Sequence, residues 1–331
     1  MKMNNKKVKP SDSAGIVFKI FLLFLSSVLF WLSNPNIFFE DGLGCLAFFN
    51  YLPILFLIKK SRFVEAVIFG AVYGGLSYGL YGYWLNAFHP LGLIIVCIGY
   101  FVICALLFSV LKWADIITLK NGWLLQFIII CGYEYLKTLG FFGMNYGVTA
   151  YTQWKNLYLI QICSLGGVFA LNYIVIFPSV FLFSLISKKK EKYRLLNNVD
   201  NGKKSSISAY VKKEKALSDT SLKLTFICGG LWLAIFAASY IYGLSVMGKN
   251  NSDRYVTVAA IQNNESPWKN GIEEYSRNVN KLIQLTEEAQ SLSSEIDFVV
   301  WPETAVAPSI IYNYDYGTDM RRFLLISQLL N

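Results

Sequence analysis

Charged residues and histidine are scarce in this sequence. Asp, Glu, Lys and Arg make up only 15% of the 331 residues, whereas hydrophobic residues make up 55%. Soluble domains carry about 25% charged residues, so this composition excludes an ordinary soluble domain and is typical of a membrane protein. His89 is the only histidine. A site built from several His and Cys ligands is therefore excluded, and we expect no metal or other cofactor.

The cysteines lack the spacing of a metal site or of a disulfide framework. All lie in apolar stretches, so we interpret them as small buried hydrophobic side chains. They are Cys45, Cys97, Cys104, Cys131, Cys163 and Cys228, and no cysteine follows.

Seven apolar segments dominate the first 250 residues. A helix of about 20 apolar residues crosses a bilayer core, so we expect a polytopic α-helical membrane domain of about seven spans. Four lysines precede the first segment as in a signal peptide, but it is long and no small-residue cleavage site follows, which predicts an uncleaved span. The segments lie near Ile16–Leu32, Leu43–Ile58, Val64–Leu85, Leu91–Leu111, Trp123–Leu139, Leu157–Ile186 and Leu222–Met247.

Basic and nearly uncharged loops alternate along the chain. The N-terminus and the loops at 59–62, 112–120 and 187–223 are basic, while the loops between them carry few cations. The positive-inside rule places the N-terminus and the loop 187–223 in the cytoplasm, and seven spans place the residues after Met247 outside it. We predict that 187–223 is an irregular, solvated anchor. No folded basic module is visible, so nucleic acid is not an expected partner.

Two stretches of the membrane domain have an unusual composition. The third segment is rich in glycine, which permits close helix packing. Residues 140–154 are too apolar and aromatic for an ordinary loop, and they indicate a re-entrant or interfacial segment. Glu134 and Lys19 are charged residues inside apolar segments, and neither belongs to an internal repeat of the kind that transporters show.

The sequence changes character near residue 250, which we take as the boundary between a membrane domain (1–250) and a second domain (251–331). The second domain has the order strand, helix, strand, helix, which indicates an α/β fold. About 80 residues with two strands are too few for a closed core, so we expect this domain to be incomplete at Asn331. The predicted elements are strands at 255–262 and 297–301 and helices at 272–292 and 318–330.

Glu303 is the candidate catalytic residue. It follows the second predicted strand in the run Val299-Val300-Trp301-Pro302-Glu303-Thr304-Ala305. A carboxylate at a strand end, beside an aromatic wall, is a candidate general base. In isolation, a Pro-Glu pair is also typical of a surface turn.

This run, the first strand ending in Ala260-Ile261-Gln262-Asn263-Asn264 and the preceding spans together resemble the apolipoprotein N-acyltransferase family. The resemblance implies that the second domain is the start of a nitrilase-like (CN hydrolase) αββα sandwich. The stretch 140–153 resembles that family's G-F-x-x-P-W…G-Y-x-Q segment, with departures at Asn145, Tyr146 and Ala150.

The resemblance implies a bacterial inner-membrane acyltransferase with a Glu-Lys-Cys triad and a periplasmic nitrilase-like part. Glu303 matches the glutamate, whereas the lysine and cysteine are expected beyond Asn331, so we expect the chain alone to be inactive. The cysteine would take an acyl chain from a membrane phospholipid and pass it to the N-terminal diacylglyceryl-cysteine of an apolipoprotein. A transporter and a non-catalytic protein that binds lipid or lipoprotein remain as alternatives.

Overall fold

The computed structural model describes residues 11–118, 121–140, 143–200, 207–247, 255–264, 272–293 and 295–302. The chain divides into two compact units, Met1–Lys249 and Asn250–Asn331, and each is described by itself. The predicted helix 318–330 and the candidate catalytic residue Glu303 lie outside the described residues.

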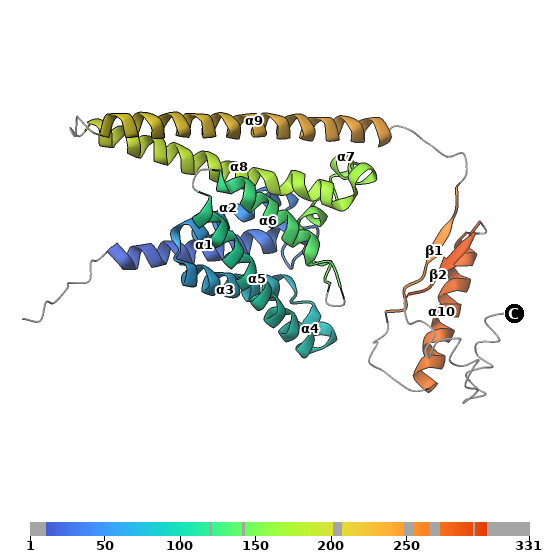
Figure 1. Cartoon of the computed structure of the whole chain (residues 1–331). Helices are drawn as coiled ribbons and strands as arrows, with labels where there is room; N and C mark the ends of the chain where they lie inside the picture. The colour runs from blue at the N-terminus through green and yellow to red at the C-terminus, as the bar shows by residue number, and fades with distance from the viewer. Residues whose placement is uncertain are drawn as a thin grey trace, which may run out of the picture. The chain divides into compact units, whose positions relative to one another are not determined.

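The described part of the first unit is mostly helical (Figure 1). Five of its helical stretches are long and apolar enough to cross a membrane, and they are Gly15–Ser33, Phe63–Tyr81, Leu91–Ile117, Cys163–Lys188 and Thr220–Met247. The elements in chain order are α1 (Ser11–Ser33), η1 (Gly44–Phe49), α2 (Tyr51–Lys60), α3 (Phe63–Tyr81), α4 (Leu85–Phe88), α5 (Pro90–Ile117), α6 (Gly122–Leu136), η2 (Thr149–Gln153), α7 (Leu157–Ile160), α8 (Cys163–Asp200) and α9 (Ile207–Met247).

Two of the seven predicted spans form helices that are shorter than expected. The segment predicted at Leu43–Ile58 is divided at Asn50 into the 3-10 helix η1 and the 10-residue helix α2. The segment predicted at Trp123–Leu139 forms the 15-residue helix α6, which ends at Leu136. In both cases the apolar run continues, but part of it is not α-helical, a difference that hydropathy does not detect.

Helices α3 and α5 approach each other through glycine, as the composition of the third segment predicts. A methyl group added to Gly74 would lie 2.0 Å from the carbonyl oxygen of Tyr100, and one added to Gly70 would lie 2.5 Å from that of Cys104. The two backbones therefore pack directly against each other, which is how small residues act in helix pairs within membranes.

Helices α8 and α9 run alongside each other as a long antiparallel pair (Figure 1). Gly167 interrupts α8 with a φ of +68°, a conformation that glycine adopts without steric strain. The basic stretch 187–223, predicted to be irregular, is helical where the structure describes it, since α8 continues to Asp200 and α9 begins at Ile207. That prediction is wrong because the Lys, Glu and Leu residues of this stretch favour helix and continue it beyond the apolar segments.

The described part of the second unit is a β-α-β motif. Strand β1 (Val258–Ala260) pairs in parallel with β2 (Phe298–Val300), and Val258 lies opposite Phe298. Helix α10 (Ile272–Leu292) connects them, as a parallel pair requires. Its Leu282 is fully buried. These elements agree in order and position with the predicted strand, helix and strand.

The strands are shorter and less buried than the sequence predicts. Val258 and Val300 are each 52% exposed. The residues between them in the pleat, Ala259 and Val299, are half-buried. Among the described residues, only one face of the strand pair is therefore covered.

Substitution of Gly74 by alanine tests the α3–α5 contact. The added methyl group would overlap the Tyr100 carbonyl, so we expect Gly74→Ala to destabilise the protein by about 1–3 kcal/mol. Gly75→Ala is the matched control, since its new methyl group would lie 3.8 Å from the nearest atom, in Phe101. Thermal unfolding in detergent micelles measures both. Equal losses of stability would contradict the contact.

Candidate functional site

The predicted catalytic position follows strand β2. Parallel strands bring their carboxyl ends to one edge, and the Ile261 N–H donates to the Val300 carbonyl at 2.9 Å at this end of the pair. The Trp301 indole Nε1 donates to Thr286 Oγ1 of α10 at 3.0 Å. The structure thus fixes the residues that lead to Glu303, whose own role remains a prediction.

A buried ion pair lies in the first unit. The carboxylate of Glu134, in the last turn of α6, and the ammonium of Lys137, which directly follows α6, are 3.1 Å apart, and each side chain is only 1% exposed. Removing two charges from water costs several kcal/mol per ion, so such a pair persists only where further hydrogen bonds satisfy its remaining lone pairs and protons. An ionisable pair at membrane depth is a functional-site candidate on these grounds.

The hydrogen bonds of Glu134 reach two other parts of the unit. The Tyr51 hydroxyl of α2 donates to Oε1. The backbone N–H of Thr149 donates to Oε2 and its hydroxyl donates to Oε1, each at 3.0 Å. The carboxylate therefore joins α2 and η2 to α6.

Lys137 holds the opposite side of the same network. Its ammonium donates to the Gly147 carbonyl at 2.8 Å and to the Tyr78 hydroxyl of α3 at 3.2 Å. Gly147 has a φ of +71°, which favours glycine at this position. Its N–H donates in turn to the Tyr81 hydroxyl at 3.1 Å. Both halves of the ion pair thus bind the chain that follows α6.

The described residues 143–153 enter the helical unit. Val148, Thr149 and Ala150 are at most 2% exposed. The Ala150 N–H donates to Asn172 Oδ1 of α8 at 3.0 Å, and Gln153 Nε2 donates to the Gly44 carbonyl at 2.7 Å. Irregular backbone is tolerated at membrane depth only where protein satisfies its polar groups, and this arrangement favours the re-entrant interpretation of the segment.

The sequence identified half of this site. Glu134 is recognisable as a charge inside an apolar segment, but the sequence analysis did not connect it with Lys137, near the end of the same segment. The spacing of three residues, which places both side chains on one helix face, is the signal that connects them. Lys19, which also lies inside an apolar segment, pairs with Glu65 of α3.

The six cysteines are all free. Cys104 and Cys131 are buried as predicted, whereas Cys45 on η1 is exposed, so the prediction of uniform burial is wrong. Among the described residues, no group of three or more His, Cys, Asp or Glu side chains is arranged to hold a metal ion.

These features define a polytopic helical membrane protein in which a buried ion pair holds the irregular segment that follows α6. Residues 26–181, which contain this site, match the family model of the apolipoprotein N-acyltransferase N-terminal domain. The membrane part of the chain is thus similar to the N-terminal domain of the apolipoprotein N-acyltransferase family.

Curated relatives agree with this family. Over 317 residues, the chain is 31% identical to apolipoprotein N-acyltransferase 1 of Treponema denticola. This aligned region covers 94% of this chain and 53% of the relative. It is 33% identical over 315 residues to apolipoprotein N-acyltransferase 1 of Treponema pallidum, with 94% and 54% covered. The apolipoprotein N-acyltransferase of Borreliella burgdorferi is 26% identical over 287 residues, with 84% and 48% covered. The chain thus spans about half the length of the curated relatives it matches.

Neutralising Glu134 tests the buried pair. Glu134→Gln leaves the Lys137 charge buried without its counter-ion, so we expect a loss of stability of about 3–5 kcal/mol. The double variant Glu134→Gln/Lys137→Met removes both charges and should recover part of this loss. Glu65→Gln is the control, because that carboxylate is 32% exposed and its pair with Lys19 is partly solvated. Unfolding in detergent compares the variants, and a double variant less stable than Glu134→Gln would argue against the pair.

Proposed function

We propose that this chain is the membrane domain and the first part of the catalytic domain of an apolipoprotein N-acyltransferase. The observation that carries the proposal is the extent of the similarity. The Treponema relatives of that name cover 94% of this chain, and the first unit supplies only residues 1–249 of 331. The similarity therefore extends into the β-α-β unit that leads to Glu303. The transporter and the non-catalytic alternatives gain no support from these relatives.

The proposed reaction transfers an acyl chain in two steps. A cysteine thiolate attacks the ester carbonyl of a membrane phospholipid, which releases the lysophospholipid and leaves a thioester. The α-amine of a lipoprotein's diacylglyceryl-cysteine then attacks the thioester, which forms the amide and returns the thiolate. Glu303 is the base that accepts the thiol proton and later the amine proton. The lysine and cysteine of this triad are expected from the part of the relatives that this chain does not span.

The proposed location is the bacterial inner membrane. We assign seven crossings, with α2 and α6 completed by the irregular segments next to them, a cytoplasmic N-terminus and a periplasmic nitrilase-like second unit. The alternation of basic and nearly uncharged loops supports this orientation. It places the second unit on the side where exported lipoproteins present their N-termini.

Glu303→Gln in the full-length protein tests the reaction. This change keeps the size of the side chain and removes the base, so we expect formation of the acyl-thioester to fall about 10²-fold or more. Glu295→Gln is the control, since Glu295 is an exposed carboxylate before β2. Mass spectrometry of the acylated enzyme and of a triacylated peptide product measures both steps. An unchanged rate would make Glu303 a structural residue.

Labelling of Cys45 tests the orientation. Cys45 lies on η1, shortly after α1, and its side chain is exposed. In spheroplasts, a membrane-impermeant maleimide should label a variant that keeps Cys45 as its single cysteine, because η1 lies on the periplasmic side. The same protein with Cys45→Ser measures the background. Labelling that requires lysis would place η1 in the cytoplasm and reverse the assignment.

A further inference from the structure

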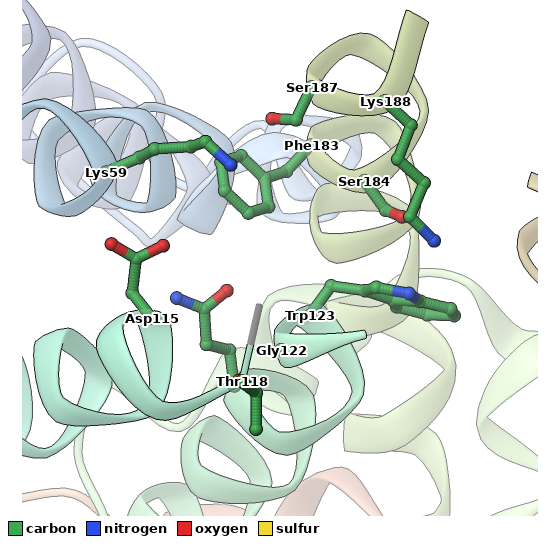
Figure 2. Close-up of a pocket in the computed structure, with 10 residues that line it drawn as sticks. Lys59, Asp115, Thr118, Gly122, Trp123, Phe183, Ser184, Ser187 and Lys188 are labelled. Carbon is green, nitrogen blue, oxygen red and sulfur yellow. The ribbon is translucent and has the colours of Figure 1, made fainter. Parts of the chain in front are cut away.

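Two pockets of the first unit differ in the charge of their lining. The pocket near the start of α6 is lined by Lys59 and Lys188 as well as by Asp115, as Figure 2 shows. Its lining carries both signs of charge and therefore selects no class of ligand by charge alone. The pocket at the carboxyl end of α3 has one carboxylate, and no basic side chain is among the described residues that line it.

This second pocket, which we call the aromatic pocket, is formed where three stretches of the membrane unit meet. Its volume is about 440 Å³, which is within the range of sites for small ligands. The end of α3 and the turn after it contribute three rings, the segment after α6 contributes a fourth, and the loop after α1 contributes the carboxylate. These side chains are Tyr81, Tyr83, Trp84, Tyr146 and Glu40.

Contacts within the protein fix the rings of the aromatic pocket. The rings of Trp84 and Tyr146 meet edge to face, with their centres 5.2 Å apart. The Tyr81 hydroxyl accepts from the Gly147 N–H at 3.1 Å, which holds the end of α3 beside the residue that follows Tyr146. The Tyr81 ring also packs edge to face on Phe30 of α1 at 5.7 Å. Binding to rings that are already held in place costs less conformational entropy.

The aromatic pocket presents negative charge. Glu40 is exposed and forms no ion pair with a described residue, whereas the neighbouring Asp41 is paired with Lys155. Helices α1 and α3 both end next to the pocket, and neither has a basic residue in its last turn. The carboxyl end of a helix carries partial negative charge, as does the face of an aromatic ring. All three features favour a cation.

The aromatic pocket also lies at the level of the membrane surface. The apolar stretches Gly15–Ser33 and Phe63–Tyr81, which are long enough to cross a membrane, both end beside it. Phospholipid headgroups lie at this level, and Tyr and Trp are common there as interfacial anchors. Anchoring needs only the rings. A set of rings around a carboxylate is instead the arrangement that recognises ammonium groups.

We infer that the aromatic pocket binds an ammonium group, carried either by a phospholipid headgroup or by a soluble amine. An ammonium ion gains from the ring faces and from the Glu40 carboxylate together, whereas an anionic headgroup without an ammonium would be repelled by Glu40. The inference goes beyond acyl transfer, since it involves neither Glu303 nor a thioester, and its tests measure binding.

The first test compares two adjacent carboxylates. For the full chain in micelles of a non-ionic detergent, native mass spectrometry compares phosphatidylethanolamine with phosphatidylglycerol of the same acyl chains, and calorimetry measures binding of choline. We expect an ammonium ligand to bind in at least one arm, and Glu40→Gln to weaken this binding about fivefold. Asp41→Asn is the matched control, because it removes the same charge from the next residue, which does not line the aromatic pocket. It should change the affinity less than twofold.

The second test removes one ring face. Tyr146→Leu should weaken binding about threefold, whereas Tyr146→Phe keeps the ring face and should keep the affinity. Tyr151→Leu is the matched control, since Tyr151 is 44% exposed against 52% for Tyr146 and does not line the aromatic pocket. It should leave the affinity unchanged.

The outcomes of these tests separate recognition from anchoring. A preference for phosphatidylethanolamine would identify a lipid headgroup as the source of the ammonium, and binding of choline without that preference would identify a soluble amine. If phosphatidylethanolamine binds no better than phosphatidylglycerol and choline does not bind, these residues are interfacial anchors and the inference is overturned. Equal losses in Glu40→Gln and Asp41→Asn, or in the two leucine variants, would also overturn it.

Discussion

The ion pair between Glu134 and Lys137 is the interaction on which the membrane unit depends. Neither charge has access to water, so each must be balanced by the other and by donors or acceptors from the protein. Glu134 obtains them from α2 and η2, and Lys137 from α3 and the backbone before η2. The irregular segment that contains the buried residues Val148, Thr149 and Ala150 is thereby tied to the helices around it.

The two polar regions of this unit differ in how completely they are satisfied. At Glu134, each carboxylate oxygen accepts hydrogen bonds from protein donors. Near the start of α6, the Trp123 indole and the Ser187 hydroxyl are buried donors without partners among the described residues. A complete network rigidifies the fold, whereas a buried donor without a partner costs stability.

Hydropathy predicted where the helices lie, since burial in lipid requires long apolar runs. It did not predict that α2 and α6 are shorter than the apolar segments that contain them, because an apolar run can turn or change helix type without a change in hydropathy. It also failed for 187–223, where helix propensity outweighed polarity. The spacing of three residues between Glu134 and Lys137 was a local signal of their pairing, whereas the partners from α2, α3 and η2 depend on tertiary contacts that no local pattern predicts. Glu303 was recognisable from its motif, and its prediction stands on that resemblance.

The spacing of Glu134 and Lys137 has a consequence for biogenesis. A charged residue at the centre of a lone helix costs about 2.5–3.5 kcal/mol on insertion. Glu134 lies in the last turn of the 15-residue helix α6, and Lys137 directly follows that helix. Because they are one helical turn apart, they can neutralise each other as soon as α6 forms, before α8 has been synthesised. The helix can then enter the bilayer as a nearly neutral element. The segment that follows α6 then packs against the pair in a later step. In that step, hydrogen bonds to protein groups replace the contacts that Glu134 and Lys137 make with lipid and water.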